Sequence, residues 1–231
     1  MNKNNRPKAI LLDFYGTVVE EDDVLLDRLC REIVEASSMD IDITDVFDYW
    51  GALFLEMCCA GHGDNFRLQR DIQKDSLEQT LARFDSEIDV PRVQRELIDF
   101  LAKPVIFPKS KDVLAACNVP VCIVSNIDNA ELESALEHTG LSFDMVVTSE
   151  DCRSYKPHSV LFERALSLLD MGSGEVLHVG DSIPNDVAGA RAMGIETLWI
   201  NRKNTVIPQN TPAPDHISSD LTGILDILKL D

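Results

Sequence analysis

Short apolar runs that each end in a polar residue are the feature that most constrains the fold of this chain. The runs cover residues 9–12, 121–124, 145–147, 176–179 and 197–200. Runs of this length are typical of strands that are buried on both faces of a sheet. Segments with helical spacing separate the last four runs. The sequence therefore predicts alternating strands and helices, which form a parallel α/β sheet.

The region after the first run has a different pattern. No proline occurs between Pro7 and Pro91, and apolar residues recur there at helical spacing, for example from Val46 to Met57. Thr44 and Asp89 are predicted to cap helices in this region. We expect a helical cap domain of residues 20–103, inserted into an α/β core domain that is formed by residues 1–19 and 104–231.

The charge of the chain restricts its partners. The formal net charge is −19 at pH 7, and so acidic a surface repels nucleic acid and anionic membranes. The apolar runs are too short to span a bilayer, and the start of the sequence has no signal-peptide pattern. We expect a cytoplasmic protein, a monomer or homodimer, that binds a small molecule and neither nucleic acid nor membrane. An anionic substrate would need a local positive centre.

Polar residues follow the predicted strands where such a centre is expected. Asp13, Ser125, Thr148 and Asp181 each follow an apolar run, and Lys156 comes soon after Thr148. Ligands of parallel sheets bind beyond the carboxyl ends of the strands. We therefore expect these side chains to converge at one edge of the sheet.

Four segments resemble, in the right order, the four motifs of the haloacid dehalogenase (HAD) superfamily. They are Asp-Phe-Tyr-Gly-Thr-Val at 13–18, Ser125-Asn126, Lys156-Pro157, and Gly-Asp-Ser-Ile-Pro-Asn-Asp at 180–186. The resemblance covers nearly the whole chain, and many members carry a cap after the first motif. It implies a Rossmann-like HAD core with a parallel sheet flanked by helices, a small helical cap, and a hydrolase whose nucleophile is Asp13.

The resemblance also implies a Mg²⁺ site. Asp13, the backbone carbonyl of Tyr15 and Asp181 would bind the ion, with Asp186 beside it. Clustered carboxylates repel one another unless a cation lies among them, and Mg²⁺ prefers oxygen ligands. The metal and Lys156 would supply the local positive charge that the acidic surface lacks.

The remaining site residues follow from the same resemblance and from the position of the cap. Ser125 and Lys156 are expected to act with Asp13 in catalysis, and Ser125 would donate a hydrogen bond to a phosphoryl oxygen. Tyr15, Thr17, Asn126 and His62 are the predicted substrate-binding residues. Thr17 is also expected to hold its loop, and His62 lies in a predicted loop of the cap that is expected to contact the substrate.

One position departs from the phosphatase pattern. HAD phosphatases usually carry a general-acid aspartate two residues after the nucleophile, and this sequence has Tyr15 there. Haloacid dehalogenases also carry Asp-x-Tyr-Gly-Thr, because a halide leaves without a proton. They replace the Gly-Asp-Ser motif, however, which is intact here. They also use a cap arginine directly after a tryptophan, whereas Gly51 follows Trp50.

We therefore predict a Mg²⁺-dependent phosphatase that acts on a small phosphorylated metabolite through an aspartyl phosphate on Asp13. Because the enzyme lacks the usual acid, we expect a substrate with a good leaving group. Acyl and aryl phosphates are such substrates. Two alternatives stay open. One is a metal-free 2-haloacid dehalogenase-like hydrolase, with Arg67 or Arg70 holding the substrate carboxylate. The other is a degenerate HAD domain that serves as a ligand- or protein-binding module.

Overall fold

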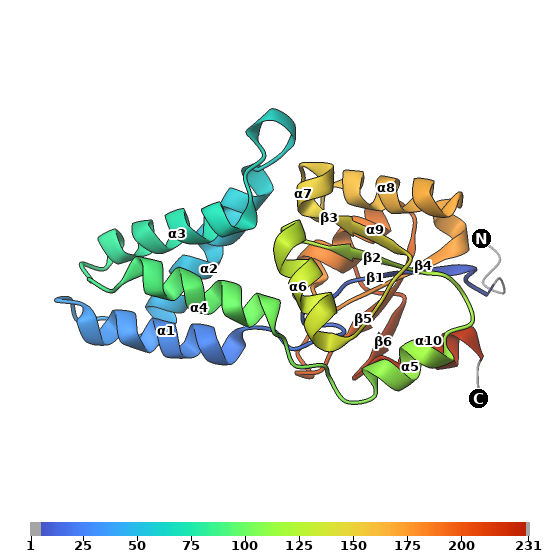
Figure 1. Ribbon diagram of the computed structural model, residues 1–231, viewed down its shortest axis with the longest axis horizontal. Coiled ribbons are helices and arrows are strands. Elements are labelled where there is room, and N and C mark those ends of the chain that lie inside the picture. The colour runs from blue at the N-terminus through green and yellow to red at the C-terminus, as the bar shows by residue number, and fades with distance from the viewer. Residues whose placement is uncertain (1–5, 230–231) are drawn as a thin grey trace.

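A single parallel sheet organises the core of this computed structural model, which describes residues 6–229 (Figure 1). The strand order is β3-β2-β1-β4-β5-β6, and every neighbouring pair is parallel. The strands are β1 (Ala9–Leu12), β2 (Val121–Ser125), β3 (Met145–Thr148), β4 (Val176–Gly180), β5 (Glu196–Ile200) and β6 (His216–Ser218). The five runs in the sequence correspond to β1–β5, and the predicted α/β fold is confirmed.

Helices cover both faces of the sheet, which explains why the central strand β1 is apolar throughout. Ile10 and Leu12 face one helical layer, whereas Ala9 and Leu11 face the other. The first layer contains α5 (Ser110–Ala116), α6 (Asn129–Thr139) and α10 (Thr222–Leu228), and the second contains α8 (Ser159–Leu169) and α9 (Ala188–Ala192). Successive side chains of a strand point to opposite faces, so a strand between two layers must be apolar at every position.

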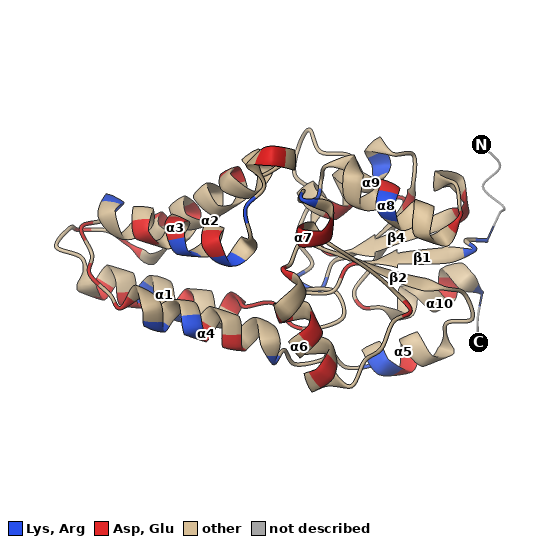
Figure 2. Ribbon diagram, turned by 45° about the horizontal axis from the view of Figure 1, so that its top comes forward, with Lys and Arg blue, Asp and Glu red and all other residues tan. Residues whose placement is uncertain are grey.

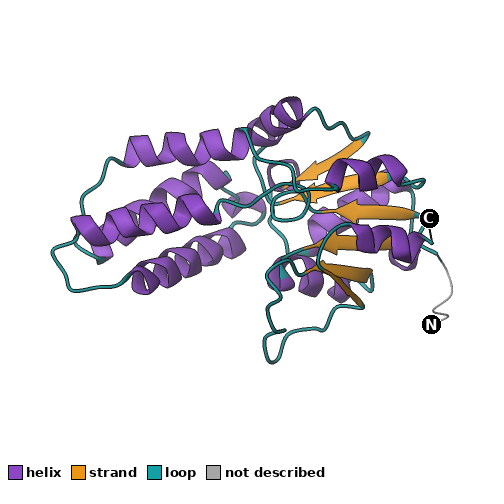
Figure 3. Ribbon diagram, turned by 90° about the horizontal axis from the view of Figure 1, so that it is seen from below, coloured by secondary structure: helices purple, strands orange, loops and turns teal. Residues whose placement is uncertain are grey.

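Four helices between β1 and α5 form a separate bundle with its own apolar cluster. They are α1 (Asp23–Ala36), α2 (Ile43–Ala60), α3 (Gln69–Arg83) and α4 (Val90–Ala102). The strand arrows in Figure 3 point toward this bundle, so it lies beyond the carboxyl ends of the strands. The helices fall within the predicted cap, whose domain boundaries stay a prediction. Acidic residues occur on helices of both the bundle and the core in Figure 2.

The two connections between the bundle and the core run side by side. Val19 and Ile106 form an antiparallel bridge. The amide of Glu20 donates to the carbonyl of Val105 at 2.8 Å, and the amide of Phe107 donates to the carbonyl of Val18 at 3.1 Å. The bundle is therefore anchored to the core through a short two-stranded connection.

The structure corrects some local predictions. Asp89 caps α4 as predicted, with its carboxylate accepting from the amide of Arg92. Thr44 is not the cap of α2, because Asp42 accepts hydrogen bonds from the amides of Thr44 and Asp45. The sequence analysis also missed β6 and α5, together with α7 (Ser149–Cys152), two 3₁₀ turns (Gly63–Asn65, Ser173–Glu175) and a π-helical turn (Ile183–Val187). These elements are too short to show a periodic pattern.

Within residues 6–229, none of the helices combines the length and the apolar character that a bilayer crossing requires.

The burial of β1 leads to a first prediction. Leu11→Ala should lower the free energy of unfolding by about 2–5 kcal/mol, because it opens a cavity under α8. Leu168→Ala is the matched control, because Leu168 lies on α8 and 39% of it is exposed. Its effect should stay below about 1 kcal/mol. Urea unfolding of both variants measures the difference, and equal losses would contradict the two-sided burial of β1.

Candidate active site

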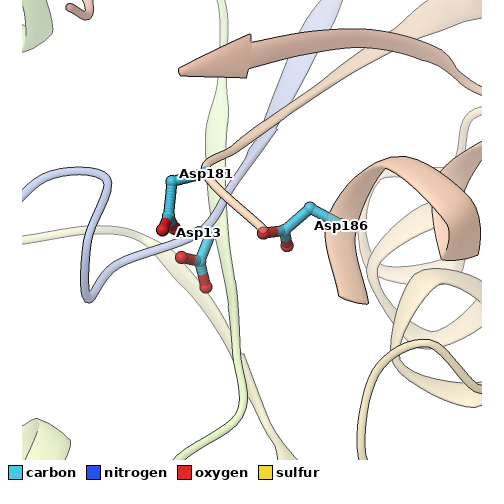
Figure 4. Close-up of side chains that lie close together, drawn as sticks. All are labelled: Asp13, Asp181 and Asp186. Atoms are coloured by element: carbon cyan, nitrogen blue, oxygen red, sulfur yellow. The ribbon is translucent and has the colours of Figure 1, made fainter. Parts of the chain in front are cut away.

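Three carboxylates meet at the carboxyl edge of the sheet. Asp13 follows β1, Asp181 follows β4, and Asp186 lies on the π-helical turn after β4. Figure 4 shows the three side chains gathered at this edge. One oxygen from each carboxylate lies within 4.8 Å of the others. Asp13 is far from Asp181 and Asp186 in the sequence, and the fold brings Asp13 and Asp181 together at this edge, as expected, with Asp186 beside them.

Lys156 joins two of these carboxylates. Its Nζ lies 2.6 Å from Oδ1 of Asp13 and 2.6 Å from Oδ1 of Asp186, and only 2% of the side chain is exposed. Burial alone would lower the pKa of Lys156, but the attraction of the two carboxylates raises it above its ordinary value. Lys156 is therefore held as a cation at the centre of the site.

Asp186 is held in place from several sides. Nε2 of His178 lies 3.0 Å from its Oδ1, and the amide of Ser182 donates to its Oδ2 at 3.0 Å. Burial raises the pKa of Asp186, but Lys156 and His178 together bring it below its ordinary value. Gly180 is needed here, because a Cβ at this position would collide with the side chain of Asp186. Both oxygens of Asp186 thus have protein partners, and the residue anchors Lys156.

His178 was not among the predicted site residues. It lies in β4 with 1% of its surface exposed, and its ring meets Phe162 edge-on at 5.1 Å. Its Nε2 contacts Asp186, as described above. The signal in the sequence was a histidine inside the apolar run at 176–179, because a buried imidazole requires a hydrogen-bond partner.

The opposite side of the site carries uncompensated negative charge. The hydroxyl of Thr17 lies 3.2 Å from Oδ2 of Asp13 and 3.1 Å from Oδ1 of Asp181, so it bridges them. Burial raises the pKa of Asp13 in spite of Lys156. Burial and the neighbouring Glu21 raise the pKa of Asp181 well above its ordinary value. Among the described residues, no lysine or arginine forms an ion pair with Asp181. This side of the site is the place where a cation fits.

Glu21 is a second residue that was not among the predicted site residues. Its carboxylate faces that of Asp181 across Gly16. Gly16 has a φ of +77°, and a Cβ there would lie 2.6 Å from Oδ2 of Asp181. Glycine is therefore required both by the left-handed backbone and by the close approach of the carboxylates. No motif in the sequence marked Glu21, because only the turn of the chain into the cap brings it to the site.

The residues after β2 flank Lys156. Ser125 ends β2 with 2% exposure, beside Thr148 of β3. The side chain of Asn126 holds the backbone of Lys156 at two points. Its Nδ2 donates to the carbonyl of Lys156 at 3.1 Å, and its Oδ1 accepts from the amide at 2.7 Å. Asn126 therefore fixes the loop that carries the central cation.

A cavity of about 210 Å³ lies between this edge and the helical bundle, and we call it the cap-side cavity. Tyr15 and Asn126 are among its lining residues. The hydroxyl of Tyr15 donates to the backbone carbonyl of Leu101 at 2.8 Å, and burial raises the pKa of Tyr15 above its ordinary value. A second cavity of about 370 Å³ lies on the other side of Glu21, against Asp181 and Trp199.

His62 and two arginines lie elsewhere. Nδ1 of His62 is 3.0 Å from the hydroxyl of Ser154, and its ring stacks on His158 at 5.0 Å. Arg67 pairs with Asp75 at 2.8 Å, and Arg70 pairs with Asp128 at 3.3 Å. None of His62, Arg67 and Arg70 is among the described residues that line the two cavities. We therefore leave His62 out of the proposed site.

The sequence of this chain is similar to those of known hydrolases. The model of the haloacid dehalogenase-like hydrolase family matches residues 7–194. A ribulose-1,5-bisphosphate 5-phosphatase of Halopiger xanaduensis is 35% identical over 104 residues, which are 43% of this chain and 44% of that protein. Haloacetate dehalogenase H-2 of Moraxella sp. (strain B) is 23% identical over 231 residues, covering 96% of this chain and 97% of that protein.

The fold is also similar to those of solved dehalogenase structures. The L-2-haloacid dehalogenase RSc1362 superposes with a TM-score of 0.79 at 21% identity, over 97% of this chain and 100% of that chain. This chain spans about half the length of several curated relatives that it matches. The family match, in contrast, extends across most of the chain and includes all four predicted motifs. The chain belongs to the haloacid dehalogenase-like hydrolases.

Proposed function

We propose that this hydrolase is a Mg²⁺-dependent phosphohydrolase in which Asp13 attacks the phosphorus of a small phosphorylated substrate. The observation that carries the proposal is the charge balance of the site. Among the described residues, Lys156 is the one lysine paired with this cluster, and it is shared between Asp13 and Asp186, so Asp181 has no cationic partner. Three carboxylates within 4.8 Å of one another, with a single cation among them, are costly unless a further cation binds.

The donor atoms suit a hard divalent ion. Asp13 and Asp181 offer carboxylate oxygens, and the backbone carbonyl of Tyr15 follows in the same loop, whereas Asp186 is engaged by its protein partners. Mg²⁺ prefers such oxygen ligands and retains some water molecules. When bound, the ion would offset the charge of the phosphoryl oxygens.

The residues of the chain then have separate tasks. Lys156 and Thr17 orient the carboxylate of Asp13, so that one of its oxygens forms the new bond to phosphorus. The bond from phosphorus to the leaving oxygen breaks, and that oxygen departs with the electron pair. Ser125 would donate a hydrogen bond to a phosphoryl oxygen. Water then hydrolyses the aspartyl phosphate and regenerates Asp13.

The leaving group must depart without help from residue 15. The hydroxyl of Tyr15 is committed to the carbonyl of Leu101, and its pKa is raised by burial. A tyrosine in this state is a poor proton donor to a leaving alkoxide. We therefore assign the enzyme to phosphates whose leaving group is a stable anion, such as aryl or acyl phosphates.

Dehalogenation is the second candidate function. The similarity to haloacetate dehalogenase H-2 extends over 96% of the chain, and the Tyr15 position fits a reaction that needs no acid. A 2-haloacid carries a carboxylate, however, and needs a cation to hold it. Arg67 and Arg70 do not line either cavity, and each is already paired with an aspartate, Asp75 and Asp128 respectively, which favours the phosphatase.

A direct assay separates the two functions. The enzyme should release phosphate from 4-nitrophenyl phosphate with Mg²⁺ and not with EDTA, and it should release no chloride from 2-chloropropionate. Asp13→Asn should reduce phosphate release by roughly 10³-fold or more, because it removes the nucleophile. Chloride release that is unaffected by EDTA would instead establish the dehalogenase. If neither product forms while a ligand or protein binds tightly, the chain is a binding module.

The crowded carboxylates predict an effect on stability. Asp181→Asn should raise the free energy of unfolding of the metal-free protein at pH 7 by about 1–3 kcal/mol, because it removes a buried charge without a cationic partner. The pKa of Asp181 is raised in the folded state, so the folded protein loses stability as the pH rises through that pKa. The gain should therefore vanish as the pH falls toward the ordinary value of 3.8.

Thermal unfolding measures this effect, and Mg²⁺ provides the control. The melting temperature of the original protein should rise with Mg²⁺ at pH 7, and that of Asp181→Asn should respond little. Equal Mg²⁺ responses of the two proteins would exclude Asp181 as a metal ligand.

The role of Tyr15 leads to a prediction on substrates. The rate with 4-nitrophenyl phosphate is to be divided by the rate with n-butyl phosphate. This ratio should be roughly 10²–10⁴-fold larger than the same ratio for a HAD phosphatase that has the general-acid aspartate, because such an acid accelerates the loss of an alkoxide by about that factor. Tyr15→Phe should leave this ratio unchanged. Fast turnover of n-butyl phosphate that Tyr15→Phe abolishes would mean that the tyrosine itself donates the proton.

A further inference from the structure

The cap-side cavity contains acidic side chains and no basic ones. Glu21 and Asp22 line it, and no lysine or arginine occurs among its described lining residues. Burial raises the pKa of Asp22 to about 6, so it is still mainly ionised at pH 7. A negatively charged group placed in this cavity would meet two carboxylates and no cation.

The basic residues near the cavity are already neutralised. Arg70 lies 3.3 Å from Asp128 and 3.8 Å from Glu131, and both of those acids are buried. Lys203 lies on the far side of Glu21 and pairs with Glu21 at 3.3 Å and with Asp23. Moving either cation toward a ligand would leave buried or half-buried carboxylates without a partner, which is costly.

The walls of the cavity are apolar and suit a ring. Its aromatic and aliphatic lining residues include Leu26, Phe47, Trp50, Phe54, Leu97 and Leu101. The indole N–H of Trp50 donates to the hydroxyl of Ser76 at 3.1 Å, so this residue offers the cavity its apolar surface. A volume of about 210 Å³ is smaller than the pockets that hold drug-sized ligands, and it fits a single ring.

The charged groups that line the cavity are both hydrogen-bond acceptors. They are the carboxylates of Glu21 and Asp22. These two carboxylates favour a ligand that carries a hydrogen-bond donor or a positive charge.

We propose that the leaving group of the substrate is a single apolar ring with a cationic or hydrogen-bond-donating substituent and without a second anionic group. The proposal rests on the proposed function, because the cavity adjoins the predicted reaction centre at Tyr15 and Asn126. According to this proposal, bisphosphates and substrates that carry a carboxylate are disfavoured.

Binding of benzylphosphonates tests the proposal without requiring turnover, because their P–C bond resists hydrolysis. Calorimetric titration of the full chain with Mg²⁺ would compare the 4-methyl, 4-aminomethyl and 4-carboxy compounds. The first two should bind at least roughly ten-fold more tightly than the third, since one uncompensated charge contact amounts to that factor or more. Equal or tighter binding of the 4-carboxy compound, or no binding of any, would overturn the proposal.

Gly51 allows the charge of the cavity to be changed. It lines the cavity on α2, and a Cβ at this position would meet no atom within 4 Å, so a side chain can be added there. Gly51→Arg should reduce or reverse the preference against the 4-carboxy compound, because it adds a cation. Gly51→Met is the control for size and should retain the preference. An identical change in both variants would show that charge does not control selection.

Hydrolysis of the matching phenyl phosphates distinguishes this inference from the proposed function. If the 4-carboxy ester is hydrolysed as efficiently as the 4-methyl ester, the inference fails and the phosphatase stands. If the binding preference holds but no phosphate is released from any ester, the proposed function fails, whereas the charge selection of the cavity is retained.

Discussion

The double ion pair of Lys156 is the interaction on which the rest of the site depends. It joins the loop after β1 to the turn after β4 through Asp13 and Asp186. A buried lysine is stable only when its charge is matched, and the removal of one partner leaves an unpaired charge inside the protein. Two surrounding contacts fix the members of this ion pair, because Asn126 binds the backbone of Lys156 and His178 contacts the carboxylate of Asp186.

The asymmetry of this arrangement separates structural carboxylates from reactive ones. Asp186 has protein partners at both oxygens, so its charge is satisfied within the chain. Asp181 has a hydroxyl and another carboxylate as neighbours, and its pKa is raised well above its ordinary value. A further cation is therefore needed only on the side of the cluster where Asp181 lies, and this is where we propose that the metal binds.

Much of the fold and part of the site were predictable from the sequence. The apolar runs located β1–β5, and the ordered motifs located Asp13, Lys156, Asp181 and Asp186, because both signals are local in the sequence. Glu21 and His178 were not among the predicted site residues, because their contacts with Asp181 and Asp186 arise only when the chain is folded. His62 was predicted to read the substrate from its loop, but its ring stacks on His158 instead, and sequence spacing does not reveal the direction of a loop.

The paired connections at Val19 and Ile106 have a consequence for how the chain acquires its fold. Strands β1 and β2 are neighbours in the sheet although about a hundred residues separate them in the chain, and closing so long a loop costs conformational entropy. The bridge between Val19 and Ile106 divides this long loop, because it closes the ends of the bundle on each other. Only short segments then remain between the bridge and the two strands, so the entropy of the inserted helices bears little on the pairing of the sheet.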